Sequence, residues 1–222
     1  MNSTKGTNSR NRTEKAVARA LLDRQESTYL TQAGVSLRNT PGPLYQALVL
    51  AVLLSARIRA DIAVAAARAL FDAGLRTPRS MAGASWQQRV DALGEGGYRR
   101  YDERTATILG KGADLLLERY GGDLRKLRET DDPKGKLREI PGLGPTGVDI
   151  FLRTVQTIWP EFAPSIDRKA RDGAERLDLP TSSERLASLV SKRELPRFTD
   201  GLVRAALDKP LADEVLAEAR ST

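Results

Sequence analysis

The stretch that decides the fold is residues 137–152, which read LREIPGLGPTGVDIFL. We expect a first helix to end at Pro141, because proline lacks the N–H that a helix interior requires. Gly142 and Gly144 permit positive φ in the tight connection that follows. Pro145 suits the first turn of a second helix, where a missing N–H costs nothing. The stretch therefore predicts two helices joined by a short glycine turn.

Such a turn presents free backbone N–H groups, and the second helix directs its positive end the same way. Both features favour a bound phosphate. Because only backbone groups take part, the contact positions DNA without reading its sequence. The residues expected to make it are Gly142, Leu143, Gly144, Thr146 and Gly147. The same pattern also fits an ordinary helical hairpin with a glycine turn.

The rest of the 222-residue chain has a helical period nearly throughout, with no long alternation of apolar and polar residues. This pattern predicts an all-α protein of about ten helices. The stretch from Tyr45 to Ser55 is apolar on every face, which is typical of a helix buried on all sides. We therefore expect this helix to lie at the centre of a helical domain.

The absence of cysteine and histidine excludes several kinds of site. Disulfides, zinc–cysteine sites and iron–sulfur clusters need cysteine, and a Ser-His-Asp triad needs histidine. Any acid–base chemistry must therefore use carboxylates, lysine or tyrosine. We expect neither a metal site nor a cofactor.

Charge and terminal composition bear on partners and location. A net charge of +7 points weakly to a polyanion such as nucleic acid, and it fits a merely basic protein equally well. Residues 1–13 are polar and basic and are expected to form a disordered tail. Since no signal peptide or membrane span is visible, we expect a protein of the cytoplasm that does not bind a membrane. We further expect it to be associated with the nucleoid and to be a monomer.

A second informative stretch, WPEFAPSIDRK, occupies residues 159–169. In it Asp167 follows a proline-constrained loop and precedes an expected helix. A carboxylate at this position is commonly an N-cap, which accepts a hydrogen bond from the first helical turn. It also suits a carboxylate at the wall of a cleft, so two interpretations of Asp167 stand at this point.

Taken together, these motifs resemble those of a known family. In order they are LLSAR at residues 53–57, YDERTATI at 101–108, IPGLG at 140–144, and Asp167. The sequence resembles the helix–hairpin–helix base-excision DNA glycosylases of the endonuclease III superfamily over about residues 43–180. The resemblance implies a two-lobed all-α fold. Residues 43–156 are expected to form a six-helix barrel lobe, and residues 14–42 with 157–222 the second helical lobe, with DNA across the cleft between them.

The resemblance also assigns roles to single residues. Asp167 falls on the essential aspartate, which stabilises the oxocarbenium character of the sugar as the glycosidic bond breaks. Arg57 falls where some members insert a side chain into the gap left by a flipped base, although it equally suits a helix-terminal cation. Thr146 stands where strand-cleaving members have a lysine, and it cannot do amine chemistry. The chain also lacks the cysteines that bind an iron–sulfur cluster in many members.

The function that the resemblance implies is that of a DNA glycosylase, which removes a damaged or mispaired base from double-stranded DNA without cutting the strand. Two alternatives remain open: a glycosylase-fold protein that binds DNA but has lost catalysis, and an AP-site lyase that uses a different lysine. The lysines considered for the second alternative are Lys111, Lys136 and Lys169.

Overall fold

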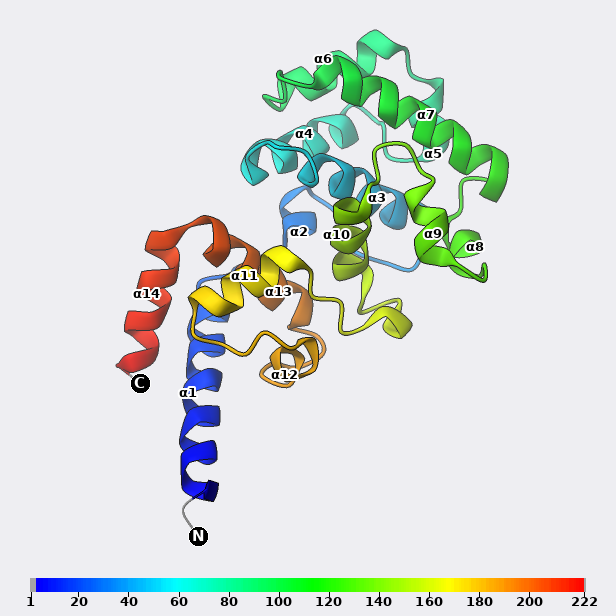
Figure 1. Ribbon diagram of the computed structural model, residues 1–222. Helices are drawn as coiled ribbons and strands as arrows, with labels where there is room; N and C mark the ends of the chain where they lie inside the picture. Colours follow the sequence, from blue (N-terminus) through cyan, green and yellow to red (C-terminus); the bar gives the residue numbers. More distant parts are fainter. Residues whose placement is uncertain (1–2, 222) are drawn as a thin grey trace. The chain divides into compact units, whose positions relative to one another are not determined.

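The computed structural model describes residues 3–221, with side chains from residue 11 onward (Figure 1). In this range the chain forms fourteen α-helices and one 3₁₀ helix and contains no strand, which confirms the all-α prediction. The number exceeds the expected ten because five helices have six residues or fewer, too short for a clear period. The elements are α1 (Ser3–Asp23), α2 (Tyr29–Gln32), α3 (Pro41–Leu54), α4 (Ala60–Asp72), α5 (Pro78–Gly83), α6 (Trp86–Glu95), α7 (Asp102–Tyr120), α8 (Leu124–Arg128), α9 (Pro133–Arg138), α10 (Pro145–Val155), η1 (Pro160–Phe162), α11 (Arg168–Arg176), α12 (Ser183–Ala187), α13 (Leu195–Leu207) and α14 (Lys209–Arg220).

The chain divides into two compact units. Unit 1 comprises Met1–Thr28 and Trp159–Thr222, and unit 2 comprises Tyr29–Ile158. Residues 29–42 therefore belong to unit 2, whereas the sequence placed them in the other lobe. The physical reason is that Tyr29, Leu30 and Val35 are buried, and α2 packs against α4 of the same unit. Residues 43–156 contain eight helices, α3 to α10, rather than six, and three of these have six residues or fewer.

Helix α3 is the centre of unit 2, as its sequence predicts. Its side chains are buried on every face, and it packs against α4, α8 and α10. Leu44 and Leu53 are fully buried, and Tyr45 is only 2% exposed. Burial of the Tyr45 phenol raises its pKa well above the ordinary value, so this side chain stays neutral in the core. None of the described helices, α3 included, is long and apolar enough to cross a membrane.

Local signals in the sequence set the boundaries of the helices around α3. Thr77 and Ser85 each form a capping box, in which the side chain accepts from a backbone N–H three residues on and the reciprocal bond is also present. Helix α7 ends at Gly121, whose φ of 62° is left-handed. These caps fix where α5 and α6 begin and where α7 ends, and both α5 and α6 pack against α7.

Unit 1 is held together by apolar contacts among helices from both ends of the chain. Helix α1 packs against α13 and α14, and α11 packs against α13. The closest approach is at Gly173, where an added Cβ would overlap the carbonyl oxygen of Leu202. Only glycine allows α11 to lie this close to the backbone of α13. The buried side chains that fill the unit include Leu21, Phe198, Leu202 and Val215.

The expected disordered tail at residues 1–13 was wrong for residues 3–13, because α1 begins at Ser3. Residues 1–2 lie outside the described residues. The reason is that helix formation is cooperative. Val17 and Leu21 are buried in the core of unit 1 and hold the later part of α1 in place. Residues before them can then extend the existing helix, which needs no new unfavourable nucleation step.

We predict that Leu53→Ala lowers the free energy of unfolding by about 2–5 kcal/mol, because it leaves a cavity at the centre of unit 2. Leu207 is 61% exposed, and Leu207→Ala is the matched control, with an expected change below about 0.5 kcal/mol. Urea denaturation followed by circular dichroism measures both. Equal losses in the two variants would contradict the central position of α3.

Candidate nucleic-acid interface

The connection between α9 and α10 is a glycine turn. The N–H of Leu143 donates to the carbonyl of Ile140 at 3.0 Å, which closes a four-residue turn. Pro141 and Gly142 occupy its two central positions, and Gly142 has a φ of 84°. Proline followed by a residue with positive φ is the arrangement of a type II turn, in which glycine suits the second central position. Residues 137–152 therefore contain the predicted glycine turn between two helices, of which the first ends at Arg138 rather than at Pro141.

Gly142 is wedged between two helices of unit 2. A Cβ added to it would overlap Cγ2 of Ile108 on α7 and would lie 3.2 Å from Cγ1 of Val52 on α3. Two independent constraints therefore require glycine at position 142: the positive φ of its backbone, and the lack of space for a Cβ beside Ile108 and Val52. The sequence pattern did not single out Ile108 and Val52 as supports of the turn, because nothing local shows which distant side chains meet it.

Gly144 differs from the expectation. Its φ is −68° and its ψ is −178°, which any residue adopts, and an added Cβ would meet no atom within 4 Å. It is the N-cap of α10, and no side chain caps this helix. Positive φ is therefore a property of Gly142 alone in this turn, and Gly144 serves instead to leave the helix end open.

The open end of α10 presents unpaired donors. In the part of the chain that the structure describes, no hydrogen bond is made by the amides of Gly142, Gly144, Thr146 and Gly147. Gly142, Gly144 and Thr146 are exposed and Gly147 is buried, so an anion can approach the first three of these residues from solvent. Amides at a helix N-terminus carry about half a positive charge in total, which favours an anion there.

Leu143 does not contribute a donor to this interface. Its N–H is engaged in the turn, and its side chain is 1% exposed. The N–H of Leu143 is therefore used within the turn and its side chain within the core, and a DNA contact of this residue stays a prediction. Gly147 makes that packing possible, since an added Cβ would lie 3.0 Å from Cδ1 of Leu143.

Arg57 lies close to the same helix end. It follows the C-cap of α3, Ser55, whose Cβ lies 3.6 Å from the position of an added Cβ on Gly147. Arg57 is exposed and makes no hydrogen bond or ion pair with any of the described residues. Unit 2 thus brings the glycine turn and the loop of Arg57 together, although they are distant in sequence.

An acidic residue precedes the turn, and its charge is compensated. Glu139 accepts from Lys136 at 2.8 Å and also forms an ion pair with Arg119 of α7. The hydrogen bond from Lys136 and then its charge, followed by the hydrogen bond and the charge of Arg119, hold the pKa of Glu139 below its usual value. The carboxylate is therefore ionised, but two cations offset it and leave the neighbourhood of the turn positive.

Asp167, the second predicted feature, belongs to unit 1. It is the N-cap of α11, with its Oδ1 accepting from the N–H of Ala170 at 2.8 Å, and it is 9% exposed. The N-cap interpretation is thus confirmed. Its position depends on α11, which the close contact at Gly173 fixes against α13.

The lysines considered as alternative amines differ in their surroundings. Lys136 is hydrogen-bonded to Glu139, which raises the pKa of its ammonium, and Lys169 is paired with Asp172 at 2.9 Å. The raised pKa of Lys136 favours its charged form, which cannot attack a sugar. Lys111 is exposed and makes no ion pair with the described residues. Thr146 is exposed in the first turn of α10.

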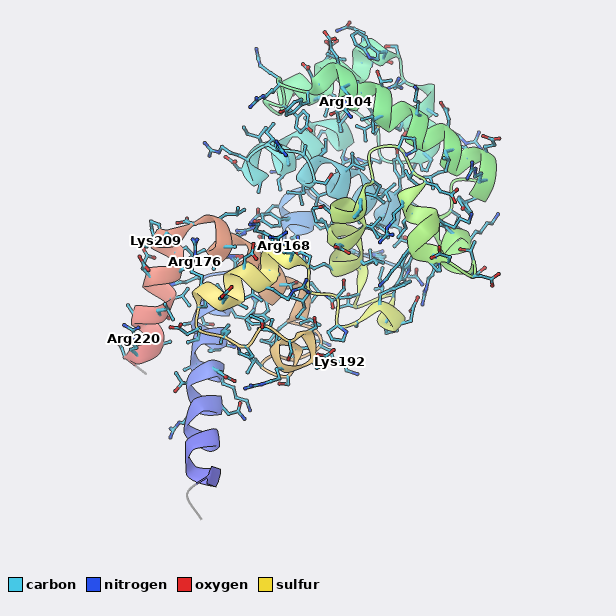
Figure 2. The ribbon with its side chains drawn as sticks, in the orientation of Figure 1. Arg104, Arg168, Arg176, Lys192, Lys209 and Arg220 are labelled. Atoms are coloured by element: carbon cyan, nitrogen blue, oxygen red, sulfur yellow. The ribbon has the colours of Figure 1, made fainter. Side chains whose placement is uncertain are left out.

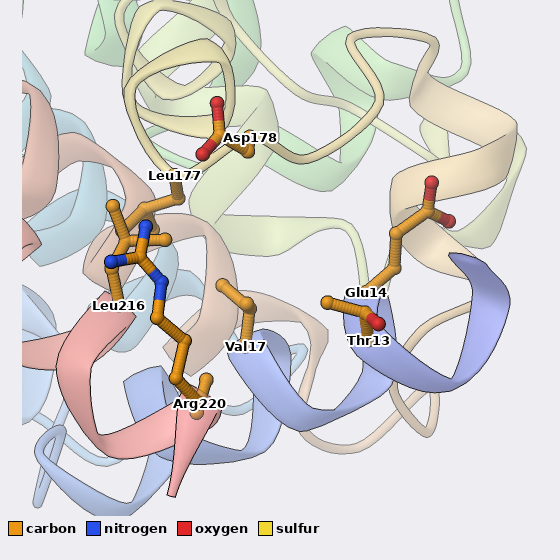
Figure 3. A pocket seen from close by; sticks show the side chains of 8 residues that line it. Thr13, Glu14, Val17, Leu177, Asp178, Leu216 and Arg220 are labelled. Carbon is orange, nitrogen blue, oxygen red and sulfur yellow. The ribbon is translucent and has the colours of Figure 1, made fainter. Parts of the chain in front are cut away.

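A groove within unit 1 lies apart from these residues. It runs between α1, the end of α11 and α14 (Figure 3). Among its lining residues, Glu14 already pairs with Arg185 at 2.8 Å. None of the residues predicted for the site lines it. The glycine turn and Asp167 therefore remain the two candidate features.

We predict that Gly142→Ala lowers the free energy of unfolding by more than Gly74→Ala does. Gly74 has a similar φ of 86° but no neighbour within 4 Å of an added Cβ, so its substitution isolates the backbone strain. That strain costs about 1–2 kcal/mol, and the overlap with Ile108 adds to it at Gly142. Urea denaturation of both variants measures the difference. Equal losses would mean that the turn is not wedged against α7.

Comparisons with known proteins give two likenesses of fold. No protein-family model matches the chain, and no curated protein matches it. One similar solved structure is a trapped covalent intermediate of endonuclease III with DNA, an estranged-adenine complex, with a TM-score of 0.48 and 19% identity over 77% of this chain and 75% of that one. Another is a non-covalent endonuclease III–DNA complex, with a TM-score of 0.49 and 19% identity over 77% and 74% of the two chains.

Proposed function

We propose that this protein binds duplex DNA through the glycine turn and acts as a DNA glycosylase that hydrolyses the N-glycosidic bond of a damaged or mispaired base. The observation that carries the proposal is the set of four unpaired amides at the turn and at the start of α10. A phosphate supplies the acceptors that these donors lack. Arg57 and the net charge of +7 add attraction that does not depend on sequence.

The proposed chemistry uses Asp167. Breaking the N-glycosidic bond develops positive charge on the sugar, and an ionised carboxylate nearby stabilises that charge and orients the attacking water. Support for this role comes from the motif order that the chain shares with the endonuclease III superfamily. The capping bond occupies Oδ1 and holds the carboxylate in one orientation, which limits the reorganisation needed during the reaction.

Thr146 supports hydrolysis without strand cleavage. A lyase reaction needs an amine that forms a Schiff base with the sugar, and a threonine hydroxyl cannot form one. Two of the three candidate lysines are held in ion pairs. We therefore propose that the protein removes the base and leaves an intact strand with an abasic site.

For DNA binding, we predict that Gly144→Asp weakens affinity for duplex DNA by about tenfold to a hundredfold, the equivalent of one or two charge-assisted hydrogen bonds. Aspartate at this N-cap accepts from the amides of the first turn and places a negative charge where the phosphate binds. The same change is expected to leave the protein as stable as the wild type or more stable, since aspartate is at least as good an N-cap as glycine. Fluorescence anisotropy with labelled duplexes, together with thermal melting, measures both effects.

Gly144→Ala is the matched control for this experiment. Alanine caps poorly but leaves the amides free, so it is expected to cost stability and to retain DNA affinity. If the turn binds a phosphate, Gly144→Asp loses DNA affinity and keeps its stability, whereas Gly144→Ala loses stability and keeps its DNA affinity. If the turn is only a packing element, the two variants do not differ in DNA affinity. Unchanged affinity in Gly144→Asp would rule out the turn as the DNA contact.

For the chemistry, we predict that Asp167→Asn reduces the single-turnover rate of base removal by about 10²–10³, by analogy with the loss of one electrostatic contact in an oxyanion-type site. Asparagine caps a helix about as well as aspartate, so the variant removes the charge and keeps α11 in place. Asp208→Asn changes another N-cap of unit 1 in the same way and serves as the control. The substrates are duplexes with uracil, mismatched, oxidised or alkylated bases, developed with and without hot alkali.

The outcomes distinguish the alternatives. Product that appears only after alkali supports a glycosylase without lyase activity. Equal product without alkali, with an adduct trapped by borohydride, supports an AP-site lyase. Binding without base removal on any of these duplexes supports a protein that has kept the DNA contact and lost catalysis.

A further inference from the structure

The segment that leads into the glycine turn follows one face of α7. Glu139 pairs with Arg119, and an added Cβ on Gly112 would meet Ile140 at 3.4 Å and the carbonyl oxygen of Pro141 at 3.7 Å. Gly142 then lies against Ile108. From Glu139 to Gly142 the chain therefore advances along α7 from its C-terminal part toward its N-terminal part.

Two cations lie on α7 around the place where the turn ends. Arg104 is four residues before Ile108, and Lys111 is three residues after it, so both project beside Ile108 from the same side of the helix. At about 1.5 Å per residue, Arg104 lies roughly 6 Å beyond the contact with the turn. Figure 2 shows Arg104 on this helix.

These cations have no acidic partner, in contrast to the other basic residues beside the turn. Arg104 and Lys111 are exposed, and neither forms an ion pair or hydrogen bond with the residues that the structure describes. Arg119 and Lys136 share the carboxylate of Glu139. The acidic residues nearest in sequence are Asp102 and Glu103 for Arg104 and Asp114 for Lys111, and neither cation pairs with any of them in the part of the chain that the structure describes. Between the two cations, Thr107 accepts from the indole N–H of Trp86 at 3.1 Å.

We propose that Arg104 and Lys111 bind the DNA phosphates that flank the one held by the turn, so that the DNA contact of unit 2 extends from α10 onto α7. The inference rests on the proposed function, since it deepens the same DNA contact. A strand of duplex DNA carries one charge per 3.4 Å of helix axis, so neighbouring phosphates lie within reach of cations placed about 5–6 Å on either side of the turn. The long side chains follow the backbone and read no bases.

The partner is the backbone of duplex DNA and not an acidic protein, because the two cations continue a site whose other donors are backbone amides. Amides at a helix N-terminus together with unpaired cations suit the compact charge of a phosphate. The side of α7 next to the turn therefore forms, with α10 and Arg57, one surface for a single strand of the duplex.

The test is a salt titration of DNA binding with Arg104→Gln, Lys111→Gln and the double variant. Each lost phosphate contact is expected to reduce the slope of log affinity against log salt by about 0.9, and the double variant by about twice that. The loss of affinity is expected to be equal on duplexes of unrelated sequence. Arg68→Gln with Lys126→Gln is the matched double control, because these residues on α4 and α8 are also exposed and the change in net charge is identical.

Thermal melting of all variants confirms that these exposed substitutions leave the fold intact. A double variant whose slope and affinity equal those of the control would overturn the inference, while Gly144→Asp independently shows whether the turn binds DNA. No binding of duplex by the wild type would overturn the proposed function and this inference with it. A borohydride-trapped adduct that disappears in Lys111→Gln would make Lys111 the reacting amine and overturn its role as a phosphate contact.

Discussion

The arrangement of unit 2 depends on the close packing of Gly142, which has no side chain, against two helices. Gly142 has a left-handed conformation and fits between Ile108 of α7 and Val52 of α3, with no room for a Cβ. Since the turn is fixed against two helices, α10 starts directly after it at Pro145 and packs against α3. The direction of its N-terminus, and so the direction of the unpaired amides, follows from this single packing contact.

The N-cap of α10 differs from the N-caps of the two helices just before it. The N-caps of α8 and α9 are Asp123 and Asp132, whose carboxylates accept hydrogen bonds from backbone N–H groups of the first turn. The N-cap of α10 is Gly144, which has no side chain to accept a hydrogen bond. A helix end without acceptors costs stability unless water or a ligand supplies them, and a phosphate supplies them together with a complementary charge. The unpaired N–H groups at the start of α10 therefore lower the stability of the free protein and also supply the donors of the proposed DNA contact.

The charged side chains around the turn also favour a bound anion. Glu139 is the acidic residue next to the turn, and Lys136 and Arg119 compensate it, whereas Arg57, Arg104 and Lys111 keep their charge free for a partner. In unit 1, the carboxylate of Asp167 is held by a capping bond and by the close packing of α11 on α13. A glycine contact therefore supports each of the two candidate features: Gly142 at the turn and Gly173 beneath α11.

The sequence by itself determined the helical class, the central helix α3, the ends of α5, α6 and α7, the glycine turn and the N-cap position of Asp167. These properties depend on residues within one or two turns of each other, where periodicity, proline, glycine and capping side chains act directly. Only the tertiary structure decided that Gly142 and not Gly144 needs glycine, that Leu143 is used for packing, that residues 29–42 belong to unit 2, and that α1 starts at Ser3. It also decided which cations remain unpaired beside the turn. These outcomes depend on contacts between residues far apart in the chain, such as Gly142 with Ile108 or Glu139 with Arg119, and a local pattern carries no information about which distant side chain fills the space.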